Sequence, residues 1–306
     1  MRVDDNMLIS VIIPVYNGER FVEKAITSAT MQPEVSEVIV VNDGSTDNTN
    51  LICKKISGED PKVKYLELTS NEGPSVARNE GMSLAKGKYI SFLDADDYFL
   101  KGRFGKSIYI LESRPEVDGV YSIVKNMGID KYGPEHTQSN ILGIKKNIHP
   151  NRLFNYMVED KNELFSIISL VFRRRILDTM GFFDTRFKYS EDLDYLYRMA
   201  LKCRLVSDNE TDPKIVRVVH GKNLTLNKQY DPATARFPLV EKWYEIMIKE
   251  GFDSRSNRFL LRRYLHLLAY NSGKLFPFPL RIWFKLYSFV LQFIKHPILL
   301  KRLLNI

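Results

Sequence analysis

Three carboxylates follow a short apolar segment near the first third of the chain. Residues 88–93 read Lys-Tyr-Ile-Ser-Phe-Leu, and Asp94, Asp96 and Asp97 come directly after them. If residues 88–93 form a strand, Asp94 and Asp96 should leave its end pointing roughly the same way, because strand side chains alternate between two faces. Two carboxylates held that close repel each other, and a cation that bridges them to a phosphate removes the repulsion. The sequence therefore predicts the metal and diphosphate end of a nucleotide site, with an acidic turn capping a helix as the structural alternative.

The expected ion is Mg²⁺ or Mn²⁺. Both are hard cations that prefer oxygen ligands, and Mg²⁺ usually takes only one or two protein carboxylates in addition to substrate phosphates. A run of two or three aspartates is therefore enough for such a site when a nucleotide supplies the remaining ligands.

The residues that must position this site alternate strand and helix patterns. The expected strands cover residues 8–15, 37–41, 63–68 and 88–93, and the expected helices cover about 19–32, a segment after Asp47, and 75–85. Asn17 and Asp47 are expected to cap the first two helices, because Asn and Asp are favoured at that position. Strands separated by helices of this length predict an α/β fold, with an open, mostly parallel, Rossmann-like sheet flanked by helices.

Ligands of such sheets bind beyond the carboxyl ends of the strands. Two of these ends carry Tyr16 and Asp43 in addition to the acidic run after residue 93. Tyr16 could stack on a nucleobase or simply pack at the strand end. Asp43 could accept the imide N–H of uracil, thymine or guanine, with an Asx-turn as the alternative.

The pattern weakens between residues 120 and 166, where we expect loops and a strand or two facing an acceptor. It returns as an expected strand at 167–172, a helix at 173–180 and a helix at 193–201. Cys53 and Cys203 lie in no metal-binding pattern, which predicts free thiols in a reducing cytoplasm. We expect no signal peptide and no membrane-spanning segment, because no uncharged apolar stretch reaches about 18 residues.

The net charge of +8 is concentrated at one end of the chain. Ten basic residues and no acidic ones follow Asp253, so residues 1–253 carry a net charge of −2. Within this tail, residues 281–295 place their polar side chains at spacings of four and three, which predicts a helix with one narrow basic stripe and a wide apolar and aromatic surface. Such a helix suits the surface of an anionic membrane, and packing on the catalytic domain or a homodimer contact are the alternatives.

Four ordered motifs resemble the signature of family 2 glycosyltransferases. They read Val11-Ile-Ile-Pro-Val-Tyr-Asn17, Val40-Val-Asn-Asp-Gly-Ser-Thr-Asp47, Gly73-Pro-Ser-Val-Ala-Arg-Asn-Glu-Gly81 and Phe92-Leu-Asp-Ala-Asp-Asp97. The resemblance covers residues 8–125, resumes at Gly181-Phe-Phe-Asp184 and Tyr189-Ser-Glu-Asp-Leu-Asp194, and fades after His220. It implies the GT-A fold and inverting transfer from a nucleotide-diphosphate sugar.

The resemblance also implies roles for single residues. Tyr16 and Asp43 would hold the base, and Pro14 would belong to the nucleotide-binding residues. Arg78 would lie near the nucleotide or pair with a surface carboxylate. Asp94 would face the ribose or the metal, Asp96 would be the direct metal ligand, and His220 would approach the metal or the diphosphate.

The acidic pair Glu191-Asp192 matches the position where the family carries its base, with Asp192 in that role. Inverting transfer is a single displacement, so one carboxylate must remove the proton of the acceptor hydroxyl. A cap for the following helix is the structural alternative, and both can hold together. Asp194 is expected to be an ordinary first-turn charge.

These features together predict a metal-dependent glycosyltransferase with a catalytic domain at 1–225 and a helical extension at 226–306. The nucleotide half would cover about 1–125 and the acceptor half about 126–225. Processive members of the family that this chain resembles carry a Gln-x-x-Arg-Trp motif after the base. None follows Asp192 here, so the resemblance favours addition of one sugar over polymer synthesis. We expect a UDP-sugar donor and a glycan or lipid-linked glycan acceptor in surface polysaccharide or lipopolysaccharide assembly, at the cytoplasmic face of the membrane and without nucleic acid. A nucleotidyltransferase and a non-catalytic membrane-surface or nucleic-acid binding module remain as alternatives.

Overall fold

The computed structural model describes residues 8–128, 140–144, 148–159, 165–187, 189–220, 238–243 and 245–246. The chain divides into two compact units, Met1–Phe154 with Asn162–Gly221 and Asn155–Lys161 with Lys222–Ile306. The expected boundary at residue 225 and the whole basic tail, including its helix at 281–295, lie outside the described residues. The architecture given below is that of the first unit.

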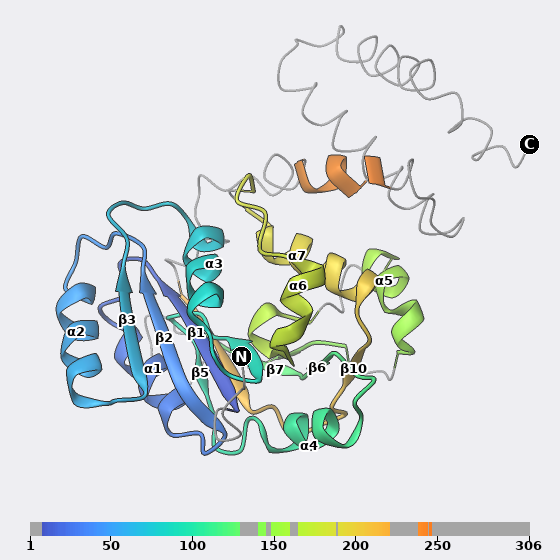
Figure 1. The fold of residues 1–306 in the computed structure, drawn as a ribbon, viewed down its shortest axis with the longest axis horizontal. Coiled ribbons are helices and arrows are strands. Elements are labelled where there is room, and N and C mark those ends of the chain that lie inside the picture. The colour runs from blue at the N-terminus through green and yellow to red at the C-terminus, as the bar shows by residue number, and fades with distance from the viewer. Residues whose placement is uncertain are drawn as a thin grey trace, which may run out of the picture. The chain divides into compact units, whose positions relative to one another are not determined.

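A seven-stranded sheet forms the centre of this unit, in the order β10-β6-β9-β4-β1-β2-β3 (Figure 1). Its strands are β1 (Ile9–Val15), β2 (Val35–Asn42), β3 (Val63–Glu67), β4 (Tyr89–Phe92), β6 (Gly119–Tyr121), β9 (Leu170–Arg173) and β10 (Leu205–Ser207). All neighbouring pairs are parallel except those of β9, which runs antiparallel to β4 and β6. The predicted α/β fold with a mostly parallel sheet is confirmed.

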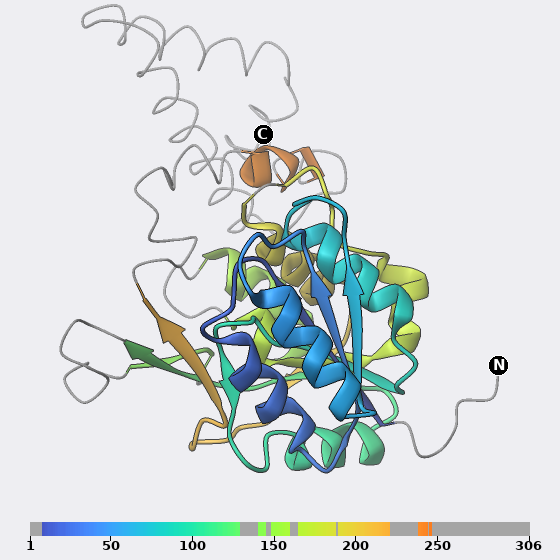
Figure 2. The same cartoon turned by 90° about the vertical axis from the view of Figure 1, so that its left-hand side faces the viewer.

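Helices cover both faces of this sheet. They are α1 (Val22–Thr30), α2 (Thr49–Glu59), α3 (Pro74–Leu84), α4 (Gly105–Ser113), α6 (Leu177–Met180) and α7 (Glu191–Lys202). A further helix, α5 (Pro150–Glu159), has its first five residues in this unit and its last five in the other. Right-handed crossovers place α1 and α2 on one face and α3 on the other, because the chain reverses direction along the sheet after β3 (Figure 2). Helix α3 packs closely on β1: a Cβ at Gly81 would lie 2.4 Å from Cγ2 of Ile12, so no larger residue fits without movement.

A second, four-stranded sheet lies beside the acidic turn, in the order β5-β11-β7-β8 (Figure 2). Its strands are β5 (Tyr98–Phe99), β7 (Val124–Gly128), β8 (Ile141–Leu142) and β11 (Ile215–Val219). Strand β5 follows the acidic residues within one turn, so this sheet continues directly from the end of β4.

The start of the first helix differs from the expectation. Helix α1 begins at Val22, and Asn17 does not cap it. Asn17 adopts a left-handed backbone conformation with φ of 50°, and its side-chain oxygen accepts the N–H of Thr46 at 2.8 Å. It therefore joins the loop after β1 to the loop after β2. Asp47 lies one residue before Asn48, which caps α2, so the expected cap is displaced by one position. The Asp47 carboxylate still accepts the N–H of Thr49, the first residue of α2, at 3.0 Å.

The second half of the unit contains more regular structure than its sequence suggested. Helix α5 lies in a region where loops were expected. It buries Leu153, Phe154 and Met157 on one apolar face, which was missed because polar residues lie between them in the sequence. The expected strand at 167–172 begins with a 3₁₀ turn (Ile167–Ser169) before β9. The expected helix at 173–180 is a 3₁₀ turn (Arg174–Ile176) followed by the short α6.

Within the residues that the structure describes, no helix is long and apolar enough to cross a bilayer.

Candidate active site

The acidic residues after β4 form a tight turn. β4 ends at Phe92, and the N–H of Asp97 donates to the carbonyl oxygen of Asp94 at 3.0 Å. Strand alternation, the basis for expecting Asp94 and Asp96 to point the same way, therefore does not apply here, because the chain has already left the strand. Burial raises the pKa of Asp96, and the nearby charge of Asp94 raises it further.

Asp96 pairs with a histidine from the end of the second sheet. Nε2 of His220 lies 3.0 Å from Oδ2 of Asp96. The imidazole stacks on the ring of Phe21, with centroids 4.7 Å apart and an interplanar angle of 9°. Phe21 precedes α1, so one aromatic contact fixes the imidazole between the β1 loop and the acidic turn. The sequence had indicated His220 but gave no sign of the ring that holds it.

The pair Asp96 and His220 fits a divalent cation by the chemistry of its donor atoms, since carboxylate oxygen and imidazole nitrogen both bind Mn²⁺. Within the part of the chain that the structure describes, no group of three His, Cys, Asp or Glu side chains could hold a metal ion. Two protein ligands would suffice if a diphosphate and water supplied the others, which is the usual arrangement for Mg²⁺. Metal binding at Asp96 and Asp94 stays a prediction.

Asp97 has a structural role next to this pair. Its side chain is 3% exposed, and Oδ1 accepts the N–H of Val218 at 2.8 Å. Burial raises the pKa of Asp97 well above its usual range, with further contributions from Asp94 and Asp96. This bond fastens β11 to the acidic turn.

Arg78 connects the acidic turn to the expected base. It lies on α3 at 5% exposure, and its two terminal nitrogens each make an ion pair of 2.9 Å, one with Asp94 and one with Glu191. Burial acts to lower the pKa of Arg78, but the charges of Asp94 and Glu191 outweigh it, and the net pKa lies above its usual value. Of the two partners left open by the sequence, Arg78 contacts carboxylates, and these belong to the site.

Asp192 occupies the first turn of α7, beside Glu191. Its Oδ1 accepts the N–H of Leu193 at 2.8 Å, and the side chain is half-buried. Burial raises the pKa of Asp192, opposed by the charge of Arg78. Burial and the neighbouring Asp192 likewise raise the pKa of Glu191. Because Glu191 is bound by Arg78, Asp192 is the carboxylate of this pair that makes no ion pair with another described residue.

Asp194 differs from the expectation of an ordinary first-turn charge. It is 0% exposed and pairs with Nε of Arg198 at 3.0 Å. The same guanidinium donates to the carbonyl oxygens of Met180 and Phe182 at 2.8 Å each. Asp194 therefore holds the 180–182 loop against α7, a role that its sequence position does not reveal.

The expected nucleobase end lies at the carboxyl ends of β1 and β2. Tyr16 is 48% exposed, as a stacking residue requires, and Pro14 is half-buried. Asp43 is 3% exposed, and its two carboxylate oxygens accept the N–H groups of Glu72 and Gly73 at 2.8 Å each. A carboxylate oxygen has a second lone pair, so contact with a base remains chemically open to Asp43. Its bonds to the start of α3 were not foreseen.

The structure therefore joins several of the predicted residues into one network. Arg78 links Asp94 to the Glu191-Asp192 pair, and Asp96 of the same acidic turn pairs with His220 at the end of β11. Tyr16, Pro14 and Asp43 lie at adjacent strand ends, where the N–H of Asp43 donates to the carbonyl oxygen of Val15 at 2.8 Å.

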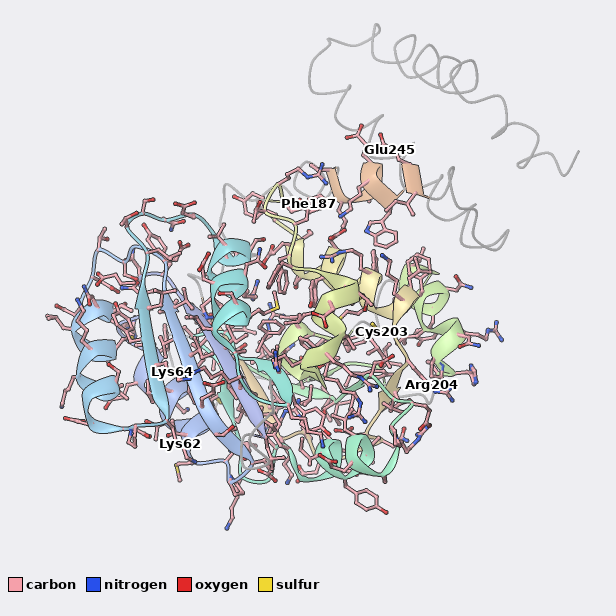
Figure 3. The ribbon with its side chains drawn as sticks, viewed as in Figure 1. Lys62, Lys64, Phe187, Cys203, Arg204 and Glu245 are labelled. Carbon is pink, nitrogen blue, oxygen red and sulfur yellow. The ribbon has the colours of Figure 1, made fainter. Side chains whose placement is uncertain are left out.

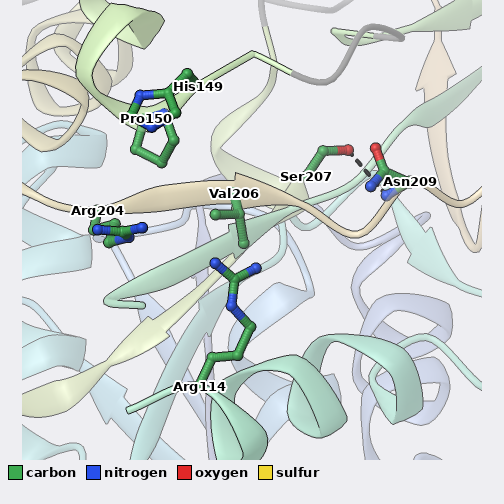
Figure 4. Close-up of a pocket in the computed structure, with 7 residues that line it drawn as sticks. All are labelled: Arg114, His149, Pro150, Arg204, Val206, Ser207 and Asn209. Carbon is green, nitrogen blue, oxygen red and sulfur yellow. Dashed lines mark hydrogen bonds between the residues drawn. The ribbon is translucent and has the colours of Figure 1, made fainter. Parts of the chain in front are cut away.

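A separate pocket of about 300 Å³ lies along the edge strand β10 and contains none of the predicted site residues (Figure 4). Its lining residues are Arg114, His149, Pro150, Arg204, Val206, Ser207 and Asn209. Cys203 directly precedes Arg204, one of these lining residues, and both are labelled in Figure 3. Cys53 and Cys203 are both free and buried, and burial raises the pKa of each thiol to about 12, which confirms the expectation of free thiols.

Comparisons with known proteins show the family of this chain. Residues 10–181 match the model of the family described as glycosyl transferase family 2. The minor teichoic acid biosynthesis protein GgaA of Bacillus subtilis is 27% identical over 284 residues, which cover 89% of this chain and 60% of that protein. The succinoglycan biosynthesis protein ExoU of Rhizobium meliloti is 26% identical over 201 residues, covering 63% of this chain and 56% of that protein. The glycosyltransferase GlyA of Streptococcus pneumoniae is 44% identical over 99 residues, 32% of this chain and 14% of that protein.

The chain thus spans about 60% or less of the length of these curated relatives. Among solved structures, S. aureus TarS 1–349 in complex with UDP-GlcNAc is similar at a TM-score of 0.62 and 21% identity, covering 86% of this chain and 72% of that one. That likeness supports the GT-A fold. With the family model covering more than half of its residues, the chain belongs to glycosyltransferase family 2.

Proposed function

We propose that this glycosyltransferase is an inverting, metal-dependent enzyme that moves a single sugar from a UDP-sugar to an acceptor hydroxyl. The observation that carries the proposal is the network in which Arg78 binds both Asp94 of the acidic turn and Glu191 beside Asp192. It ties an expected base to an expected metal and diphosphate site. Family membership favours glycosyl transfer over nucleotidyl transfer and over a non-catalytic binding module.

The proposed chemistry is a single displacement. Asp192 accepts the proton of the acceptor hydroxyl while that oxygen attacks the anomeric carbon, and the bond from this carbon to the diphosphate breaks on the opposite face. A divalent cation held by Asp96 and His220 would supply positive charge against the departing diphosphate. Glu191 cannot easily share the proton transfer, because Arg78 occupies it.

Support for the substrates is indirect. Asp43 offers a carboxylate oxygen where an imide N–H of uracil could donate, and structures of the similar TarS contain UDP-GlcNAc or UDP. ExoU and GgaA are named for the biosynthesis of succinoglycan and a minor teichoic acid. We therefore propose a glycan acceptor of a surface polymer, including lipid-linked forms.

UDP binding should require a divalent cation, because Asp94 and Asp96 otherwise repel the diphosphate. Asp96→Asn removes one ligand and should weaken UDP affinity in Mn²⁺ by at least roughly 10-fold, while the affinity for uridine stays the same. Isothermal titration calorimetry measures both, with Asp178→Asn on the exposed start of α6 as the matched control. Equal UDP affinity with Mn²⁺ and with excess chelator would sink the proposed metal dependence.

Asp192→Asn keeps the side-chain shape and removes the proton acceptor. We expect the rate of UDP formation from the UDP-sugar to fall by a factor on the order of 10²–10⁴. The affinity for UDP should stay unchanged. The base must be ionised, so the wild-type rate should fall as the pH is lowered through the pKa of Asp192. Because burial raises that pKa, the fall should begin at a higher pH than for an ordinary aspartate. A near wild-type rate in Asp192→Asn would place the base elsewhere, with Glu191 as the next candidate, and Asp178→Asn again serves as control.

Peripheral association with an anionic membrane is a further proposal, supported only by the sequence of the tail. Each basic residue near such a surface contributes about 1 kcal/mol of attraction, and ten of them follow Asp253. The full chain should co-sediment with liposomes containing phosphatidylserine at low salt and should be released as salt is raised. If it stays in the supernatant at low salt, the tail packs on protein instead.

A further inference from the structure

Arg217 is the central residue of β11, the strand beside the acidic turn. Its register partner in the parallel strand β7 is Asn126. The flanking residues Val216 and Val218 are each 3% exposed, whereas Arg217 is half-buried. Because strand side chains alternate between two faces, Arg217 leaves the opposite face from these packed valines and remains accessible to solvent.

Contacts on the C-terminal side of Arg217 fix β11 against the acidic turn. The N–H of Val218 donates to Asp97 at 2.8 Å, and His220 contacts Asp96 at 3.0 Å. Arg217 therefore lies on the segment that borders the expected metal and diphosphate end of the site.

The charge of Arg217 reaches both the acidic turn and the expected base. Burial raises the pKa of Asp97 and of Asp192, and the positive charge of Arg217 opposes that rise in both groups.

Arg217 differs from Arg78 in having no partner of its own. The two ends of the Arg78 guanidinium are bound by Asp94 and Glu191. The Arg217 guanidinium makes no ion pair or side-chain hydrogen bond within the described ranges. A partly buried cation without a partner is costly, and an anionic ligand would remove that cost.

We propose that Arg217 binds a phosphate oxygen of a substrate beside the acidic turn. The inference rests on the proposed function, because only a phosphate-bearing substrate places such an oxygen here. A guanidinium suits the task, since its planar fork donates two parallel N–H groups to a phosphate. The phosphate could come from the donor diphosphate or from a phosphate group of the acceptor, and each source predicts a different binding defect.

The test compares wild type with Arg217→Gln and Arg217→Lys by calorimetry in Mn²⁺. One arm titrates UDP, and the other titrates glycerol phosphate into the chain already saturated with UDP. Arg217→Gln should weaken one of these ligands by roughly 10- to 100-fold, since a hydrogen bond to a charged group is lost, and Arg217→Lys should lose less. Arg175→Gln, an exposed arginine outside the site, is the matched control, and thermal unfolding checks that every variant is folded.

A loss of UDP affinity identifies the donor diphosphate as the source, and a loss confined to glycerol phosphate identifies the acceptor. If Arg217→Gln binds UDP as wild type does, and binds glycerol phosphate no more weakly than wild type, the inference is wrong. Failure of the wild-type chain itself to bind UDP would instead overturn the proposed function, and this inference with it.

Discussion

The site depends on one buried guanidinium that holds two carboxylates from distant parts of the chain. Arg78 and Glu191 are 113 residues apart in sequence, and Asp94 comes from a third element. Carboxylates collected at one end of a sheet repel each other strongly where water is scarce. Arg78 offsets that repulsion, and its fixed fork sets the start of α7 against the turn after β4. Without Arg78, the carboxylates of the acidic turn and of α7 would repel each other.

This arrangement divides the carboxylates of the cleft by task. Asp94 and Glu191 are bound by Arg78, and Asp97 is bound by the backbone of β11. Asp96, paired with an imidazole, and Asp192 remain for chemistry. Geometry therefore selects one carboxylate at each end of the cleft from a sequence that offers several. The two arginines also differ: both terminal nitrogens of Arg78 are bound by carboxylates, whereas Arg217 makes no ion pair with a described residue.

Much of the fold and the position of the site followed from the sequence for a clear physical reason. Strands such as β1 and β2 are buried on both faces and read as continuous apolar runs, and their polar ends mark the ligand-binding edge. The partners of the site residues could not be predicted in the same way. The bonds from Asp43 to Glu72 and Gly73, and the stacking of Phe21 on His220, join residues far apart in sequence. Asn17 and Asp194 were given local roles because only their neighbours in sequence were visible.

The central claim is that Arg78 holds the two ends of the site together, and its removal tests this most directly. Equilibrium unfolding in urea should show that Arg78→Gln loses about 3–5 kcal/mol, because two carboxylates lose their counter-charge and Glu191 is left buried. Arg186→Gln, which breaks an exposed ion pair with Asp184, should leave the stability nearly unchanged. Equal stability of the two variants would contradict the account, since the acidic turn and α7 would then be held in place by something other than Arg78.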